Sequence, residues 1–264
     1  MLIIAGSDSG GGAGLEADLR TVAAHGLHGL VVVTAVTAQN TRVVSAIQPI
    51  SPRIVGAQLD AVFADFRIAS VKVGMLATAP IVRTVARTLG KHPEIPLVLD
   101  PVLVATTGAR LASKDLARVL RRHLLARADL LTPNLPEAES LLGRRLHGER
   151  DFPAAAADLI AMGARAVLLK GGHLGGRRVS DLLATADGRL RWFRHRRIRA
   201  EGHGTGCTLS SAIAARLADG DAMDVAVEAA IDYVHRAFVR GYRPGLGRLR
   251  VLDHLGTTPR ARRR

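Results

Sequence analysis

Short aliphatic runs alternate with longer helical stretches along most of this chain, and this alternation limits the fold more than any other feature. Runs rich in Val, Leu and Ile predict buried strands at 2–5, 30–36, 71–73, 97–99, 130–131 and 166–169. The stretches between and after them predict helices at 13–25, 52–65, 80–89, 114–125, 154–162, 208–217 and 224–239. Strands that alternate with helices form a mostly parallel sheet covered on both faces. The sequence therefore predicts an α/β fold.

One pair of strands departs from this alternation. The runs 179–184 and 190–193 are separated by Asp187-Gly188, which predicts a β-hairpin. Of the 264 residues, 48% are hydrophobic and only 3% are aromatic, so we expect a core built from Val, Leu, Ile and Ala. This length suits one α/β domain. We expect a single domain over residues 1–256 and a basic, disordered tail at 257–264.

The formal net charge of +14 raises the question of a nucleic-acid or membrane partner. Arginines gather at 192–199 and 259–264, but no nucleic-acid-binding module is visible, and aromatics are too few to stack bases. We expect neither partner, because a solvated Arg-rich surface explains the same charge and attracts ATP. No apolar stretch is long enough to span a membrane, no signal peptide is visible, and the single cysteine excludes an intrachain disulfide. These features favour a cytoplasmic protein.

A glycine-rich run, AGSDSGGGAG at 5–14, directly follows the first predicted strand. Glycines let the backbone approach a ligand closely. The run lacks the Gly-Lys-Ser/Thr of a P-loop, and no acidic residue ends the second strand to hold a ribose. On its own, a tight structural turn explains the run equally well.

A second motif, HGTGCT at 203–208, precedes an Ala-rich helical stretch. Gly204, Thr205 and Gly206 would present free backbone N–H groups at a helix N-terminus, which suits a phosphate in transfer. Cys207 would lie in the first turn, where the helix dipole lowers a thiol pKa. The alternative is a capped helix with a buried, inert cysteine. For His203, taken on its own, a structural role is favoured over a catalytic one.

Oxygen-bearing side chains follow two other strands. Asp100 ends one strand, while Asn134 and Glu137 lie in TPNLPEAE after the next. In an open parallel sheet, ligands bind outside the carboxyl ends of the strands, and magnesium prefers a few such ligands together with water and phosphate oxygens. Lys170, in LLKGGH after a further strand, is placed to reach phosphate. Each residue also has a plain structural reading: a turn Asp, an early-helix acid or a snorkelling lysine.

Taken together, the motifs identify a family. The segments AGSDSGGGAGLEADL, TAQNT, VKVGML, LDPVLVATTG, LTPNLPEAESLLG, LLKGGH and HGTGCTLSSAIAA occur in this order. They closely resemble the hydroxymethylpyrimidine/phosphomethylpyrimidine kinases of thiamine biosynthesis, in the ribokinase-like superfamily, over about residues 1–255. The resemblance implies a three-layer α/β/α sandwich with a central, mostly parallel sheet. It also implies a homodimer that uses ATP and Mg²⁺ to phosphorylate 4-amino-5-hydroxymethyl-2-methylpyrimidine and then its monophosphate.

The same resemblance implies roles for residues at matching positions. The pyrimidine pocket is expected to contain Gly6, Asp18, Gln39 and Met75, with the Asp18 carboxylate facing the aminopyrimidine. Magnesium is expected at Asp100, Asn134 and Glu137. ATP phosphates are expected at Lys170, Thr205 and Thr208, and the catalytic anion hole at Gly204, Gly206 and Cys207. Cys207 stands where many ribokinase-like enzymes place an Asp base, so its thiolate is a second candidate for that role.

Some positions depart from the family pattern and leave alternatives open. RIRAEG at 197–202 replaces a usual Thr-Lys pair, so Arg197 or Arg199 is a candidate substitute. Ala109 replaces a usual aspartate. Pyridoxal or pyridoxine kinase is the nearest alternative function, because it shares the fold. A non-catalytic pyrimidine-binding protein is another, although the retained Asp100, Lys170 and HGTGC motif argues against lost catalysis.

Overall fold

The computed structural model describes residues 1–103 and 115–257. Ala109 and most of the basic tail lie outside the described residues. Within them, the main sheet has nine strands in the order β3-β2-β1-β4-β5-β6-β7-β8-β9. The strands of this sheet are β1 (Leu2–Asp8), β2 (Leu30–Gln39), β3 (Val44–Pro49), β4 (Val71–Val73), β5 (Leu97–Leu99), β6 (Leu130–Leu131), β7 (Ala166–Leu169), β8 (Arg178–Thr185) and β9 (Leu190–Arg196). The strands from β2 to β7 in this order are parallel, and β3, β8 and β9 are antiparallel to their neighbours.

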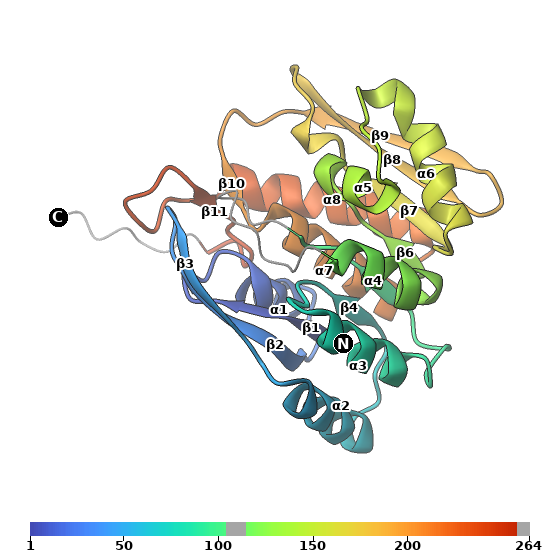
Figure 1. The fold of residues 1–264 in the computed structure, drawn as a ribbon. Coiled ribbons are helices and arrows are strands. Elements are labelled where there is room, and N and C mark those ends of the chain that lie inside the picture. Colours follow the sequence, from blue (N-terminus) through green and yellow to red (C-terminus); the bar gives the residue numbers. More distant parts are fainter. Residues whose placement is uncertain (104–114, 258–264) are drawn as a thin grey trace.

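Helices cover both faces of this sheet (Figure 1). One layer holds α1 (Gly14–Ala24), α7 (Thr205–Ala218) and α8 (Met223–Val239). The other holds α2 (Pro52–Asp65), α3 (Ala79–Leu89), α4 (Leu116–His123), α5 (Leu135–Leu142) and α6 (Phe152–Ala161). Short 3-10 turns lie at η1 (Leu125–Arg127), η2 (Glu149–Asp151) and η3 (Gly171–His173), and β10 (Gly202–His203) pairs with β11 (Arg250–Val251).

Alternation along the central strands produces two separate cores. Leu2 and Ile4 of β1 pack with the α2–α6 layer, whereas Ile3 and Ala5 pack with α1, α7 and α8. Successive side chains of a strand point to opposite faces, so a run that is apolar throughout requires a helix layer on each side. The predicted three-layer α/β/α sandwich is confirmed.

The central elements agree closely with the sequence prediction. The differences are a longer β1 and several short or peripheral elements that were not predicted. The predicted strands at 71–73, 97–99, 130–131 and 166–169 and the helix at 52–65 have the bounds seen in the structure. β1 continues to Asp8 because Gly6, Ser7 and Asp8 stay paired with β2 after a bulge. The strand β3, the helix α5 and the β10–β11 pair were not predicted. β3 is a half-exposed edge strand without a continuous apolar run.

Two features of this fold position the site. The parallel strands end at one edge of the sheet, so the polar segments that follow β1, β5, β6 and β7 come together. The β10–β11 pair joins the segment before α7 to the C-terminal part of the chain and places His203 at this edge. Among the described residues, no helix is long and apolar enough to cross a membrane.

Candidate active site

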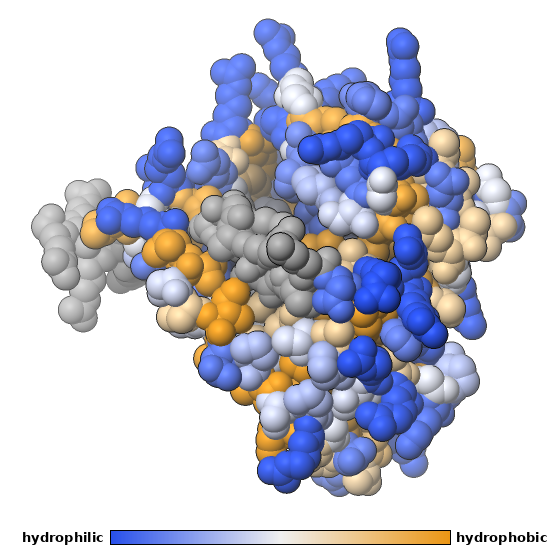
Figure 2. All heavy atoms as spheres, in the orientation of Figure 1, coloured by the Kyte–Doolittle hydropathy of each residue, from blue (hydrophilic) through white to orange (hydrophobic). Residues whose placement is uncertain are grey.

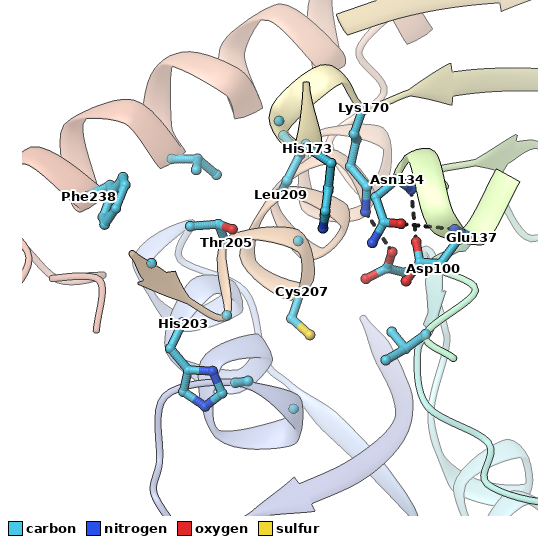
Figure 3. Close-up of a pocket in the computed structure, with 18 of the residues that line it drawn as sticks. Asp100, Asn134, Glu137, Lys170, His173, His203, Thr205, Cys207, Leu209 and Phe238 are labelled. Carbon is cyan, nitrogen blue, oxygen red and sulfur yellow. Dashed lines mark hydrogen bonds and ion pairs between the residues drawn. The ribbon is translucent and has the colours of Figure 1, made fainter. Parts of the chain in front are cut away.

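A cavity of about 770 Å³ opens at the carboxyl ends of the parallel strands. Its lining includes eleven of the thirteen predicted site residues: Gly6, Gln39, Met75, Asp100, Asn134, Glu137, Lys170, Gly204, Thr205, Gly206 and Cys207. The other two, Asp18 and Thr208, do not line it. Figure 3 shows Cys207 projecting from the start of α7, between His203 on one side and the Asp100–Glu137–Lys170 group on the other. The fold therefore gathers segments that are far apart in the sequence.

The glycine-rich loop is organised around Asp8. Its carboxylate accepts hydrogen bonds from the backbone N–H groups of Gly10 (2.8 Å), Gly12 (3.1 Å) and Ala13 (2.9 Å). Burial alone would raise the pKa of Asp8, but His203 and these N–H groups outweigh it and hold the pKa below its usual value. Sequence reasoning did not select Asp8, although an Asp directly before a glycine run is a common centre of such turns.

His203 links this loop to the opposite end of the chain. Its Nε2 lies 2.8 Å from Oδ2 of Asp8 and 3.0 Å from Nε2 of Gln39. A Cβ on Gly12 would lie 2.3 Å from Cδ2 of His203, so only glycine lets the ring pack against the loop. The ring is 3% exposed. His203 therefore has a defined place in the site wall, which the sequence motif alone did not reveal.

Asp18 lies below the cavity rather than in its wall. Its carboxylate is fully buried, 2.6 Å from Nζ of Lys72 and 2.7 Å from Oγ of Ser211. Burial alone would lower the pKa of Lys72, but the adjacent Asp18 carboxylate raises it, so the ammonium stays charged. The contact of Asp18 with the aminopyrimidine stays a prediction, and in this structure both carboxylate oxygens already have buried partners. Lys72, which was not predicted, reaches the cavity lining.

The N-terminus of α7 forms one wall. Gly204 is its N-cap with φ +81°, and a Cβ there would lie 2.0 Å from the carbonyl oxygen of Gly12. The first N–H groups of a helix have no partner within the helix, so this turn offers donors to an anion. Thr205, Gly206 and Cys207 line the cavity at this turn. Thr208 does not line it, and its buried hydroxyl lies 3.0 Å from Nε2 of His254, so its role at the nucleotide stays a prediction.

Cys207 has the opposite acidity to the one expected from its position. Burial raises the pKa of its thiol to about 12, with Asp18 and Asp100 adding to the effect and Lys72 opposing it. The half-buried thiol is therefore protonated at neutral pH. The prediction of a dipole-lowered pKa was wrong, because desolvation and two carboxylates outweigh the helix terminus. A thiolate base at this position is not supported.

Lys170 and Asp100 form an ion pair beside α7. Lys170 Nζ lies 2.9 Å from Oδ1 of Asp100, and Ser210 donates to Oδ2 of Asp100 at 3.3 Å. Burial alone would lower the pKa of Lys170, but Asp100 and Glu137 raise it. A Cβ on Gly206 would lie 3.3 Å from Nζ of Lys170, so glycine leaves room for the ammonium at the helix terminus. Positive charge and free N–H groups therefore occupy one corner of the cavity.

Asn134 and Glu137 cap α5 as a reciprocal pair. The Asn134 side chain accepts from the N–H of Glu137 at 3.0 Å, and the Glu137 carboxylate accepts from the N–H of Asn134 at 2.8 Å. Burial raises the pKa of Glu137 to about 7, with Asp100 adding to the effect and Lys170 opposing it. Glu137 thus lies in the first turn of a helix, as its structural alternative required. Both residues nevertheless line the cavity beside Asp100.

The far wall of the cavity is apolar and was not predicted. It is formed by Leu209 of α7 and by Ile231, Val234 and Phe238 of α8. Arg197, a candidate to replace the family lysine, donates to the backbone carbonyls of Gly172 (2.7 Å), Leu174 and Gly176 (3.0 Å). Its guanidinium is therefore engaged in holding that loop. Arg199 is exposed and is not in the lining.

Comparisons with known proteins agree with this geometry. The phosphomethylpyrimidine kinase family model matches residues 8–251. The hydroxymethylpyrimidine/phosphomethylpyrimidine kinase of Rhizobium meliloti is 45% identical over 257 residues, covering 96% of this chain and 95% of its own.

Two solved structures extend the comparison. A phosphomethylpyrimidine kinase from Clostridium difficile 630 has a TM-score of 0.80 and 37% identity, covering 89% of this chain and 97% of its own. A pyridoxal kinase from Staphylococcus aureus, in complex with AMP-PCP and pyridoxal, has a TM-score of 0.87 and 28% identity, covering 96% of this chain and 92% of its own. The chain belongs to the phosphomethylpyrimidine kinase family, on a ribokinase-like fold.

Proposed function

We propose that this kinase transfers the γ-phosphoryl group of ATP to the hydroxymethyl oxygen of 4-amino-5-hydroxymethyl-2-methylpyrimidine, and then phosphorylates the monophosphate. One observation carries the proposal. The N-terminus of α7 and the Lys170 ammonium share a cavity with Gln39, Gly6 and Met75. The cavity thus has an anion-binding corner and a polar site for a ring.

The phosphate corner contains the groups that a transferring phosphoryl requires. The N–H groups at Gly204 to Cys207 and the Lys170 ammonium would stabilise charge on its oxygens. Such transfers pass through a loose transition state, so positioning and charge neutralisation supply most of the catalysis. This is consistent with a protonated Cys207 that contributes a backbone donor rather than a base.

The ring corner is narrow beside β1. A Cβ on Gly6 would lie 3.0 Å from Sδ of Met75, so Met75 packs directly over the glycine. Met75 also packs with Ala35 and Ala77 in a small apolar cluster. A flat ring can stack against the cavity side of such a thioether, while Gln39 supplies polar atoms for its edge. The apolar wall of α7 and α8 is proposed for the adenine of ATP.

Magnesium fits beside Asp100 and Glu137 only if ATP phosphate oxygens and water complete its ligands. Among the described residues, no group of three or more His, Cys, Asp or Glu side chains could hold a metal ion. Asp100 and Glu137 both reach the cavity, and Mg²⁺ commonly takes one or two carboxylates plus waters and phosphate oxygens. We propose that Asp100 and Glu137 hold it there, with Asn134 contributing through water. Bound Mg²⁺ would neutralise charge on the ATP phosphates.

Pyridoxal kinase is the second candidate function. The Staphylococcus aureus pyridoxal kinase superposes over 96% of this chain with a TM-score of 0.87. The higher identity to curated pyrimidine kinases, 45% against 28%, favours the pyrimidine.

We further propose a homodimer. β3 is the edge of the main sheet, and exposed apolar residues lie near it: Val36 (46% exposed), Val43 (48%) and Leu246 (88%). Figure 2 shows hydrophobic residues gathered over β2 and β3. A second copy would cover them. Light scattering coupled to size exclusion should give about twice the 28.0 kDa chain mass, and a chain mass near 28.0 kDa would refute the dimer.

We propose one kinase domain over residues 1–256 with a basic tail after it. We also propose a cytoplasmic location, which the ATP requirement and the single cysteine support.

A mass-spectrometric assay with ATP, Mg²⁺ and hydroxymethylpyrimidine tests the function. The proposed activity gives the monophosphate first and the diphosphate later. Lys170→Met should reduce kcat by about 100-fold or more, since it removes a cation from the transferring group. Binding of the pyrimidine without any phosphorylated product would instead indicate a non-catalytic protein.

A further inference from the structure

The side-chain amide of Gln39 ends in an oxygen and a nitrogen, and its orientation decides which of the two faces a ligand in the cavity. An amide oxygen accepts hydrogen bonds, whereas an amide nitrogen donates them. A half-turn about the last side-chain bond exchanges their places with almost no change in shape. What Gln39 offers to a ring therefore depends on the atom next to it, which is Nε2 of His203 at 3.0 Å.

Asp8 decides the protonation of that nitrogen. Oδ2 of Asp8 lies 2.8 Å from Nε2 of His203. The carboxylate already accepts three backbone N–H groups, from Gly10, Gly12 and Ala13, and its pKa is held below the usual value. An ionised carboxylate can only accept. The hydrogen in the 2.8 Å contact must therefore belong to His203, and Nε2 is a donor.

The other ring nitrogen supports the same assignment. Nδ1 of His203 is buried and has no hydrogen-bond partner among the described residues. A hydrogen on Nδ1 would be a buried donor without an acceptor, which is costly. A half-turn of the ring has almost the same shape, but it would place a C–H group instead of Nε2 against the Asp8 carboxylate. A ring with its hydrogen on Nε2 meets these contacts, because that single hydrogen is shared between Asp8 at 2.8 Å and Gln39 at 3.0 Å in a three-centre hydrogen bond.

A donor at Nε2 requires an acceptor from Gln39. The amide oxygen of Gln39 must face His203, since an NH₂ group there would place two donors against each other. The NH₂ group then occupies the other branch of the amide, and Gln39 itself lines the cavity. Among the described residues, the Gln39 side chain has no hydrogen-bond partner besides His203. Its NH₂ group is therefore available for a ligand.

We propose that Asp8 and His203 are positioning residues that lock the Gln39 amide so that its NH₂ group donates to an acceptor nitrogen of the substrate ring. This deepens the proposed function and rests on it for the identity of the ring. It assigns the specificity of the ring corner to a three-residue relay, Asp8–His203–Gln39, that joins β1, β10 and β2. Ligands with an aromatic nitrogen lone pair at that position are selected over those with a C–H group.

The first test needs no substrate. Nitrogen-15 NMR of the full-length protein, labelled at its histidines, reports which ring nitrogen of each carries hydrogen, and the His203→Phe spectrum identifies the signal among the ten histidines. We expect hydrogen on Nε2 of His203 at neutral pH. A doubly protonated ring also keeps Nε2 as the donor and supports the relay. Hydrogen on Nδ1 alone would overturn it.

The second test measures discrimination between ligands. The kcat/KM for hydroxymethylpyrimidine is compared with that for the two pyridine analogues in which one ring nitrogen becomes C–H. The wild type should prefer the pyrimidine over one analogue by about 10-fold or more, the value of one hydrogen bond to the half-buried amide of Gln39. His203→Phe keeps a flat aromatic ring but removes its N–H and frees the amide to turn, so the preference should fall below about 3-fold.

His203→Gln restores a side-chain N–H for Asp8 and should recover part of the preference. A purely structural role of His203 would lower stability or kcat for all three compounds equally and leave the wild-type ratio intact, which would overturn the inference. If the wild type phosphorylates none of the three compounds, the proposed function fails, and the NMR result alone decides the relay.

Discussion

Cys207 keeps its proton at neutral pH because burial and the carboxylates of Asp18 and Asp100 raise its pKa to about 12. The thiol therefore stays mostly protonated through most of the alkaline range, whereas a thiol with the ordinary pKa of 9.0 is half ionised at pH 9.0. This separates its chemistry from that of a catalytic thiolate. We propose that its contribution to phosphoryl transfer is the backbone N–H at the start of α7.

Cys207→Ala should thus lower kcat by less than about 10-fold, because the backbone donor remains. Alkylation of the wild-type thiol by iodoacetamide should be slow at pH 7.5 and still accelerating above about pH 10, where a thiol with the ordinary pKa of 9.0 is already mostly ionised. Steady-state kinetics and mass spectrometry of the alkylated protein measure both quantities. A loss of kcat near 1,000-fold in the alanine variant, of the size expected for a missing catalytic group, would restore the base role.

Glu137 should make the stability of the ligand-free protein depend on pH. Its pKa rises from 4.5 to about 7 in the folded state, so the folded protein holds this proton more tightly than the unfolded chain. The resulting stabilisation is complete below pH 4.5 and is lost as the pH rises through about 7. The change amounts to something on the order of 3 kcal/mol.

Glu137→Gln is the matched control, because the amide oxygen still accepts the N–H of Asn134 and keeps the helix cap. Urea unfolding between pH 5 and pH 8 should show the wild type losing stability relative to this variant. A constant difference across that range would mean that Glu137 does not titrate there.

Single residues also show what sequence can and cannot reveal about the site. Gly6, Gln39 and Met75 were named from family motifs and line the cavity. Asp18 belongs to the same motifs, but the side it faces depends on packing of α1 against β4 and α7. The contact between Asp8 and His203 spans 195 positions, and no local pattern signals it.

At the scale of elements, the junction between α7 and the glycine-rich loop depends on Gly204. Its φ of +81° and the 2.0 Å approach of a built Cβ to the Gly12 carbonyl both exclude a side chain. Gly220 is a matched control, with φ +89° and nothing within 4 Å. Gly220→Ala should cost about 1 kcal/mol through backbone strain alone.

Gly204→Ala should cost clearly more than the control and should lower kcat, because the loop and the helix terminus must separate. Thermal unfolding and the kinase assay measure the two effects. Equal stability and equal activity in both alanine variants would show that this junction is not tight.

The elements that were not predicted from the sequence were missed for the same physical reason. β3 pairs with only one neighbour, β10 and β11 have two residues each, and α5 directly follows a strand and a proline. None has the periodic apolar pattern that predicts buried elements. The central strands were predicted well, because burial on both faces requires continuous aliphatic runs.

At the scale of the whole molecule, a buried ion pair joins the sheet to one helix layer. Lys72 of β4 contacts Asp18 of α1 at 2.6 Å, and Ser211 of α7 donates to the same carboxylate. Removing one charge leaves the other buried and unpaired. Lys72→Met should therefore destabilise the protein by about 3–5 kcal/mol.

The double variant Asp18→Leu with Lys72→Met should recover much of that loss, since no unpaired charge remains. Chemical unfolding of the two single variants and the double variant completes the cycle. Simple addition of the two single losses in the double variant would contradict a coupled pair.

The central claim is that the ring corner of this fold selects a pyrimidine alcohol for phosphorylation. The most direct measurement is kcat/KM for hydroxymethylpyrimidine and for pyridoxal, with ATP and Mg²⁺, on one preparation of the wild-type protein. We expect hydroxymethylpyrimidine to be preferred and its monophosphate to be converted further to the diphosphate. A preference for pyridoxal, with pyridoxal phosphate as the main product, would contradict the account.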